Sequence, residues 1–148
     1  MKKVFNRKAR FNYDILERFE AGVILSGPEV KSVKQGNIRL DDAFIRIDKN
    51  QEAWLVNSHI HPYKFAMNKD FIPNRSRKIL LHAKEILAIQ KIIEAKNLAL
   101  VPTSCYTKKG KVKLELALAK GKKQWQKKEA IKKRDLQREM ARELKEIG

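Results

Sequence analysis

Few side chains in this chain have the types and spacing that chemistry requires. His59 and His61 are two residues apart, so on a strand they would share one face and could meet at a metal ion, yet no cysteine or acidic ligand accompanies them. The single Cys105 has neighbours typical of a buried strand and needs no basic partner to explain it, which favours a structural thiol over a nucleophile. No glycine-rich phosphate loop, nucleophile elbow or pair of spaced carboxylates occurs. The sequence therefore predicts a protein that is not an enzyme and that uses no metal or cofactor.

The charge of the chain points to a polyanionic partner. Lys and Arg number 34 against 17 Asp and Glu among 148 residues, a formal net charge of +17. Such self-repulsion lowers stability unless a polyanion offsets it, and nucleic acid is the leading candidate. The hydrophobic content of 43% is enough for one core, so the charge decorates a folded body. No apolar stretch approaches the roughly 20 residues of a membrane span, and residues 1–7 carry no signal core, so we expect a cytoplasmic protein.

Basic side chains gather beside flat aromatic groups at three places. The clusters are Asn6–Arg10 beside Phe11 and Tyr13, Arg75–Lys78 near Tyr63, and Lys120–Lys128 around Trp125. A lysine run by itself is more often a solvated face. Cations that neutralise phosphates next to rings that stack on unpaired bases are typical of proteins that bind single-stranded or looped RNA. His82, at the entrance to a predicted helix, is interpreted as a capping or RNA-facing residue.

The first half of the chain is expected to hold strands with one short helix. Residues 1–12 are interpreted as a basic arm, and residues 13–25 as a strand region in which Gly22 offers a bend or bulge. Pro28 and Gly36 suit the first turn and the C-cap of a helix, with Glu29 at the favourable end of its dipole. Residues 40–47 and 52–60 are predicted to form a hairpin around the turn 48–51.

The second half is expected to continue with a loop, a helix and a clear hairpin. We predict an exposed basic loop over 64–78, a helix over 79–97, and strands over 99–106 and 112–118 around a turn at 108–110. These elements do not alternate as β-α-β units. The predicted fold is mainly β, an antiparallel oligonucleotide-binding-like barrel with two or three accessory helices, formed by residues 1–119.

Residues 120–148 differ in character from the predicted barrel. They contain eleven basic and five acidic residues, no β pattern, and a thin apolar stripe at Leu136, Met140, Leu144 and Ile147. Good helix formers are present, but isolated helices of this length are marginal in water. We therefore expect a tail that is disordered alone and helical when bound to its target.

Several blocks of the sequence resemble one known family. The run from Gly22 to Gly36, GVILSGPEVKSVKQG, closely resembles the signature of the SsrA-binding proteins, also called small protein B, the partners of bacterial transfer-messenger RNA. Other blocks match in the same order: Asn6–Ala9 with Tyr13–Ile15, Ile60–Tyr63, Arg77–His82 and Ala117–Lys123. The resemblance covers nearly the whole chain. It departs from the family after Lys123, where Gln126 and Lys128 stand in place of the usual Asp and Arg, and at Pro28, where a small or hydroxyl residue is common.

The resemblance implies a function in ribosome rescue. The barrel would hold the tRNA-like domain of transfer-messenger RNA and bring it to the vacant A site of a stalled ribosome. The tail would occupy the empty decoding site and messenger channel, with elongation factor Tu expected nearby. No membrane or small-molecule substrate is implied. The alternatives left open are a ribosomal or assembly protein, a general single-stranded RNA-binding protein of the same fold, and, less favoured, a nucleic-acid-modifying enzyme.

The predicted site residues form two groups. The group predicted to bind transfer-messenger RNA is Asn6, Arg7, Lys8, Tyr13, Glu29, Lys31, Lys34, Arg75, Arg77, Lys78 and His82. The group predicted to enter the ribosome is Lys120, Gly121, Lys122, Lys123, Trp125, Lys127, Lys128, Lys132, Lys133, Arg134 and Arg138.

Glu29 is unusual among these residues because an acid repels phosphate. It could cap its own helix, orient Lys31 or a basic neighbour, or accept hydrogen bonds from bases. On the functional interpretation, Glu29→Ala should weaken RNA binding and leave the fold intact.

Overall fold

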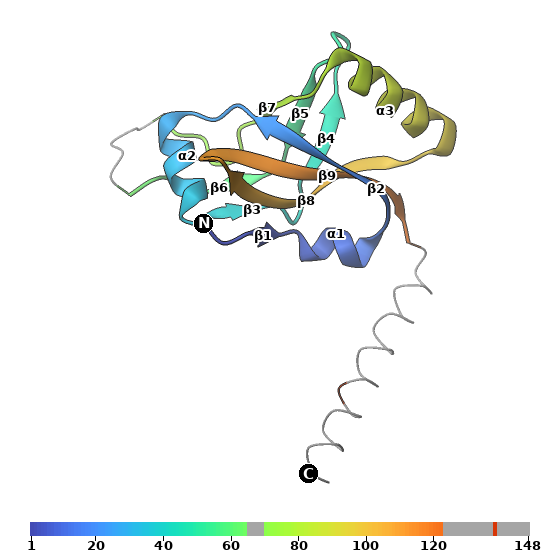
Figure 1. Cartoon of the computed structure of the whole chain (residues 1–148). Coiled ribbons are helices and arrows are strands. Elements are labelled where there is room, and N and C mark those ends of the chain that lie inside the picture. The colour runs from blue at the N-terminus through green and yellow to red at the C-terminus, as the bar shows by residue number, and fades with distance from the viewer. Residues whose placement is uncertain (65–69, 123–137, 139–148) are drawn as a thin grey trace.

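The computed structural model describes residues 1–64, 70–122 and 138 (Figure 1). Within these residues the chain forms nine strands and three helices. In chain order they are β1 (Val4–Phe5), α1 (Arg7–Asn12), β2 (Tyr13–Val23), α2 (Gly27–Lys34), β3 (Ile38–Arg39), β4 (Phe44–Ile47), β5 (Ala53–Val56), β6 (His59–Ile60), β7 (Arg77–Leu80), α3 (Ala83–Lys96), β8 (Ala99–Lys108) and β9 (Lys111–Gly121). None of the described helices is long and apolar enough to span a membrane.

Seven of the strands make one antiparallel sheet in the order β1-β8-β9-β2-β7-β5-β4, and β3 pairs with β6 separately. Strand β4, at one edge, lies against β8 although the two are not hydrogen-bonded neighbours. The sheet is therefore curled so that one edge approaches a strand near the other, which is how a barrel begins to close. The prediction of a mainly β, antiparallel fold with accessory helices is confirmed.

The β8–β9 hairpin lies between β1 and β2 in the sheet and agrees best with the sequence. Its turn residues Lys109 and Gly110 have φ angles of 52° and 77°, the left-handed pair that a tight hairpin turn requires. Alternate residues of β9 point into the core, where Leu114, Leu116 and Leu118 are buried. Strand β9 continues to Gly121, however, so the folded part extends two residues beyond the predicted boundary at Ala119.

The N-terminal residues are folded rather than an open arm. Val4 and Phe5 pair with β8, and α1 follows at once. Asn6 caps this helix, since its side-chain oxygen accepts a hydrogen bond of 3.0 Å from the backbone N–H of Ala9. Its Nδ2 atom also donates to the backbone oxygens of Leu40 and Pro102, each at 2.8 Å. Asn6 therefore ties the start of the chain to two distant segments, and the interpretation of residues 1–12 as an arm is wrong.

Helix α2 begins and ends as the sequence predicts. Ser26 and Glu29 form a capping box, in which each side chain accepts a hydrogen bond from the other residue's backbone N–H. Beyond the last helical residue, Gly36 has a φ of 83°, which favours glycine. Gly22, by contrast, makes no bulge: β2 changes register between Ile15 and Glu17 instead.

Other segments differ from their predictions at their ends. The predicted strand 40–47 begins only at Phe44, and the segment 52–60 divides into β5 and β6 because Asn57 adopts a left-handed φ of 62°. The predicted helix 79–97 begins at Ala83, since Ile79 and Leu80 belong to β7. Arg77 and Lys78 also lie in β7, so they are not part of an exposed loop. Apolar residues at 79 and 80 fit both a strand and a helix, and pairing with β2 and β5 decided between them.

Candidate nucleic-acid interface

A buried carboxylate lies at the end of the molecule where α2 meets β7. Glu29, 2% exposed, projects from the first turn of α2 and accepts a hydrogen bond of 2.6 Å from Nε of Arg77 and one from Nη2 of Arg75. Arg77 is itself completely buried, and its remaining donors reach the carbonyl oxygen of Pro73 at 3.0 Å and the hydroxyl of Ser58 at 3.1 Å. One carboxylate thus binds two guanidinium groups.

The protonation of Glu29 follows from this arrangement. Burial by itself would raise the pKa of the carboxyl group, because it disfavours the charged form. The hydrogen bonds from the backbone N–H of Ser26 and from Arg75 and Arg77 outweigh burial, and the pKa of Glu29 lies below its usual value. The carboxylate is therefore ionised at neutral pH and holds both arginines in place.

The two arginines differ in what they can reach. The side chain of Arg77 has no exposed surface, so it cannot contact RNA in this conformation; the expectation of an exposed Arg77 is wrong. Glu29 is likewise too buried to accept hydrogen bonds from bases, and it pairs with Arg75 and Arg77 rather than Lys31. Arg75 keeps 44% of its side chain exposed. Of the orienting roles considered for Glu29, the structure supports the one directed at a basic neighbour, Arg75.

Other residues predicted to bind RNA lie on α2, on β7 and at the start of α3. Lys31 and Lys34 are exposed on α2, and the ammonium group of Lys31 lies 5.4 Å from the ring centre of Tyr63. Lys78 on β7 is partly exposed, with its nitrogen 3.5 Å from a carboxylate oxygen of Glu52. His82 occupies the N-cap position of α3 but makes no side-chain capping hydrogen bond, and 92% of its side chain is exposed. These residues form the α2–β7 surface: Lys31, Lys34, Arg75, Lys78 and His82.

The remaining predicted residues lie at the other end of β2. Arg7 and Lys8 are exposed on α1, Tyr13 begins β2, and Asn6 is buried as the cap of α1. Helix α1 precedes β2 and α2 follows it, and at about 3.3 Å per residue the strand separates them by roughly 30 Å (Figure 1). Lys8 forms an ion pair of 2.6 Å with Asp42, which partly neutralises it. The structure therefore divides the predicted RNA-binding residues between two ends of the molecule.

A neighbouring apolar ridge was missed by the sequence reasoning. Leu80, 53% exposed, lies between two shallow grooves of about 340 and 410 Å³, and Gly22 and Lys113 line both. A Cβ atom at Gly22 would lie only 3.3 Å from Leu80, so the glycine allows this close approach. In a strand, adjacent side chains point to opposite faces, so Leu80 must be exposed where Ile79 is buried. The sequence could predict this only if residues 79 and 80 had been assigned to a strand.

Charged groups surround this ridge, which we call the Leu80 ridge. Lys111 and Lys113 project from β9, and His82 begins α3 on the other side. The carboxylate of Glu20 accepts a hydrogen bond from the hydroxyl of Tyr106 and lies 3.4 Å from the ammonium group of Lys108. The hydrogen bond from Tyr106, followed by the interactions with Lys108 and Lys113, lowers the pKa of Glu20. The ridge thus offers an apolar contact beside the cations of Lys111 and Lys113, with the carboxylates of Glu20 and Glu85 lining one of the two grooves.

His59 and His61 lie close together, as their spacing in the sequence predicts, but no further metal ligand of the described residues joins them. Nε2 of His59 lies 3.4 Å from Nδ1 of His61, with the rings edge-on at 4.7 Å between centres. Burial, and then the nearby His61, lowers the pKa of His59. Among residues 1–64, 70–122 and 138, no group of three metal-ligating side chains occurs.

Most of the predicted tail residues are not described. Lys120 and Gly121 belong to β9, where they pair with Asp14 and Tyr13, and Lys122 follows that strand. Arg138 is helical and exposed. Lys123, Trp125, Lys127, Lys128, Lys132, Lys133 and Arg134 lie outside the described residues.

Comparisons with known proteins agree with this architecture over nearly the whole chain. A family model described as "SmpB protein" matches residues 3–146. An SsrA-binding protein of Persephonella marina is 49% identical over 140 residues, which cover 95% of this chain and 91% of the relative. One from Mycobacterium tuberculosis is 50% identical over 139 residues, covering 94% and 86%.

A solved structure extends the likeness to the fold. A chain described under "tmRNA-SmpB: a journey to the center of the bacterial ribosome" is 39% identical, with a TM-score of 0.69 over 84% of this chain and 87% of that chain. The resemblance read from the sequence blocks is thereby confirmed, and the chain belongs to the SmpB family of SsrA-binding proteins.

Proposed function

We propose that this protein binds the tRNA-like domain of transfer-messenger RNA and delivers it to the A site of stalled ribosomes, so that translation switches to the tag-encoding frame. The observation that carries the proposal is the family match over residues 3–146. Relatives with 49% and 50% sequence identity to this chain are SsrA-binding proteins. The protein acts by binding and positioning, without a chemical step of its own, in the cytoplasm where ribosomes work.

The α2–β7 surface and the Leu80 ridge form the RNA grip. Arg75 is fixed at one side by Glu29 and keeps donors free for a phosphate, which a guanidinium group can bind through two hydrogen bonds. Lys31, Lys34, Lys111 and Lys113 add cations on either side. Leu80 supplies an apolar contact for the face of an unpaired base or a sugar. Phosphate contacts set the orientation, and the fixed ridge selects a looped RNA over a regular duplex.

The α1 end of the molecule faces the ribosome. Strand β9 ends beside α1, where the backbone N–H of Lys122 donates a hydrogen bond of 2.9 Å to the carbonyl oxygen of Asn12. The tail therefore departs from the end opposite the RNA grip, together with exposed Arg7. Its cations and Trp125 would then enter the decoding site and messenger channel, which are lined with ribosomal RNA, and become helical there. Elongation factor Tu, bound to the aminoacylated RNA, would lie near the RNA grip.

The test separates the two ends. Leu80→Ser with Arg75→Ala should weaken binding of the full chain to transfer-messenger RNA and abolish tagging on stalled ribosomes. Trp125→Ala with Lys127→Ala and Lys128→Ala should leave RNA binding near normal and still reduce tagging. A truncation should end at Lys122, because ending at Ala119 would remove two paired residues of β9.

The alternative is a ribosomal or general single-stranded RNA-binding protein of the same fold. Such a protein would bind transfer-messenger RNA, ordinary tRNA and unstructured RNA with similar affinity at matched salt. Equal affinities, or loss of RNA binding on changing only the tail, would reject the proposed division between RNA grip and ribosomal tail.

A further inference from the structure

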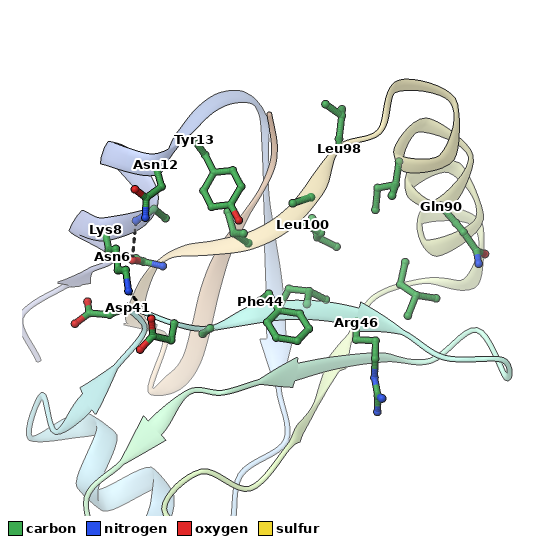
Figure 2. Close-up of a pocket in the computed structure, with 18 of the residues that line it drawn as sticks. Asn6, Lys8, Asn12, Tyr13, Asp41, Phe44, Arg46, Gln90, Leu98 and Leu100 are labelled. Atoms are coloured by element: carbon green, nitrogen blue, oxygen red, sulfur yellow. Dashed lines mark hydrogen bonds and ion pairs between the residues drawn. The ribbon is translucent and has the colours of Figure 1, made fainter. Parts of the chain in front are cut away.

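One cavity of this basic molecule has no excess of positive charge. It has a volume of about 620 Å³ and opens between α1, β4, α3 and β8 (Figure 2). Lys8 and Arg46 line it together with Asp41, Asp42 and Glu94, and Lys8 is already paired with Asp42. Phosphate groups would gain little here, so a further contact with RNA is favoured where cations are in excess.

The face of the sheet opposite the core has such an excess, and it adjoins the Leu80 ridge. Residues paired across antiparallel strands share a face. One row of paired residues crosses β1, β8, β9 and β2 as Phe5, Ser104, Glu115 and Glu20. The next row crosses β8, β9, β2 and β7 as Tyr106, Lys113, Gly22 and Leu80. Between the rows, Cys105, Leu114 and Ala21 are buried in the core, so both rows point away from it.

Phe5 is an exposed aromatic ring with two cations beside it. The residue is 43% exposed, whereas Val4 next to it packs against the core. The guanidinium group of Arg10 lies 4.9 Å from the centre of the Phe5 ring, and the ammonium group of Lys3 lies 5.6 Å from it. The same ammonium group lies 5.1 Å from the ring centre of Tyr106. Aromatic rings among cations are typical of surfaces that stack unpaired bases and bind their phosphates.

Glu115 holds two of the surrounding cations in place. One of its carboxylate oxygens accepts a hydrogen bond of 3.1 Å from the hydroxyl of Ser104 and lies 3.9 Å from the ammonium group of Lys3. The other oxygen lies 3.7 Å from Nε of Arg18. About half of each cationic side chain stays exposed, 45% for Lys3 and 56% for Arg18. Glu115 thus positions surface cations, as Glu29 positions Arg75.

We call this surface the Phe5 face: Lys3, Phe5, Arg10, Arg18, Tyr106 and Glu115. Its three cations outnumber its one carboxylate. It is continuous with the Leu80 ridge, because Tyr106 pairs with Lys113, and the pairs of that row lead through Gly22 to Leu80. At about 4.8 Å between neighbouring strands, β1 and β7 are four spacings, roughly 19 Å, apart across the sheet. One strand of RNA can therefore follow both surfaces.

We propose that the Phe5 face binds an unpaired segment of transfer-messenger RNA that continues from the Leu80 ridge. One base stacks on Phe5, and Lys3, Arg10 and Arg18 bind the neighbouring phosphates. Lys3 and Arg10 have long, flexible side chains, so a base can displace them from the ring and they can turn to the RNA backbone. This contact rests on the proposed function, since the same RNA makes it.

Other occupants fit the Phe5 face less well. A regular duplex keeps its bases stacked inside, so it would offer phosphates to the cations and no base to Phe5. An acidic protein segment would likewise bind the cations and leave the ring without a stacking partner. Base stacking on Phe5 is therefore the contact that distinguishes an unpaired RNA segment from both.

The first experiment measures binding of the full chain to transfer-messenger RNA at fixed salt. Phe5→Leu keeps an apolar side chain and removes the ring, so Kd should rise about tenfold with the loss of one stacked base. Phe5→Tyr keeps the ring, and its Kd should stay within about twofold of the wild-type value. Phe44→Leu is the matched control, since Phe44 is 39% exposed on β4, and it should leave Kd unchanged. Thermal denaturation checks that the three variants are folded.

A second experiment locates the RNA without removing the ring. Photoreactive benzoylphenylalanine in place of Phe5 should cross-link to unpaired nucleotides of transfer-messenger RNA when the complex is irradiated. Reverse transcription maps the cross-linked nucleotides, and the same sites should appear in the free complex and on stalled ribosomes.

Three outcomes would overturn the proposal. An unchanged Kd for Phe5→Leu would mean that no base stacks on the ring. Equal losses for Phe5→Leu and Phe44→Leu would mean that the effect is not specific to the Phe5 face. Cross-links only to paired nucleotides, to ribosomal RNA or to a protein would assign the face to another partner. Each result can occur while the wild type still prefers transfer-messenger RNA to ordinary tRNA, whereas absence of that preference would reject the proposed function itself.

Discussion

Glu29 and Arg77 form an ion pair beneath the surface: Nε of Arg77 donates a hydrogen bond of 2.6 Å to Oε2 of Glu29, and both side chains are buried. The same carboxylate binds Arg75, whose side chain reaches solvent. One acidic residue therefore stabilises the fold through Arg77 and positions a surface cation through Arg75. This double contact explains why an acid stands among the cations of the α2–β7 surface.

Removing the carboxylate should destabilise the protein, contrary to the expectation that Glu29→Ala leaves the fold intact. Glu29→Gln would leave Arg77 charged and buried without its partner, and loss of one member of a buried pair costs about 3–5 kcal/mol. Urea denaturation measures this loss. Glu52→Gln, which breaks an exposed pair with Lys78, should cost less than about 1 kcal/mol. Equal, small losses for both variants would show that the buried pair does not stabilise the fold.

The pH dependence of stability should follow the lowered pKa of Glu29. A carboxyl group with a lower pKa in the folded state than in the unfolded state contributes stability at higher pH, because the unfolded state binds the proton more readily. This contribution is complete above the ordinary value of 4.5 and is lost as the pH falls through the lowered pKa. In denaturation experiments from pH 7 to pH 2, the free energy of unfolding should fall more steeply for the wild type than for Glu29→Gln. Parallel curves would contradict the assignment.

Arg75 and Arg46 offer a matched pair of exposed arginines, one on the α2–β7 surface and one on β4. Arg75→Ala should weaken binding to transfer-messenger RNA and lower the slope of affinity against salt by about one phosphate contact. Arg46→Ala should change neither. Binding titrations at four salt concentrations measure both quantities. Equal losses of affinity for the two variants would mean that RNA binding depends only on the overall charge of the protein.

Asn6 should matter for stability rather than for RNA contact. Asn6→Ala removes the cap of α1 and the two donors to Leu40 and Pro102, for which we expect a loss of about 2–3 kcal/mol. Asn12→Ala, at the other end of the same helix, is the control and should cost less than half as much. Thermal denaturation checks the stability, and RNA binding measured well below the transition should be unchanged. If the folded Asn6→Ala variant bound RNA more weakly than the wild type, the prediction that Asn6 contacts RNA would be supported.

Cys105 should be unreactive in the folded protein. Burial raises the pKa of its thiol to about 12, so almost no thiolate exists at pH 8, and the residue is fully buried in the hydrophobic core. A thiol-specific reagent should modify it only as the protein unfolds, and fully in denaturant. Rapid modification of the native protein at pH 8 would show that β8 opens readily.

The sequence by itself determined the local elements and the family. Three local patterns depend on the intrinsic preferences of a few adjacent residues: the alternation over the first half of β9, lysine and glycine in the β8–β9 turn, and the Ser26–Glu29 capping box. The ordered sequence blocks identified the family for the same reason, since they are read residue by residue. The composition likewise sufficed to predict a folded body, although a small second cluster of Ala9, Val101 and Ala119 lies apart from the main core.

Only the tertiary structure decided which charges are buried and which surfaces face the same way. Arg75 and Arg77 are two residues apart and chemically identical, yet pairing of β7 with β2 and β5 buries one and exposes the other. The Leu80 ridge combines residues of β2, β7 and β9, which are distant in the chain, so no local pattern can report it. Burial depends on the whole fold, because a side chain is covered by residues that are neighbours in space and not in sequence.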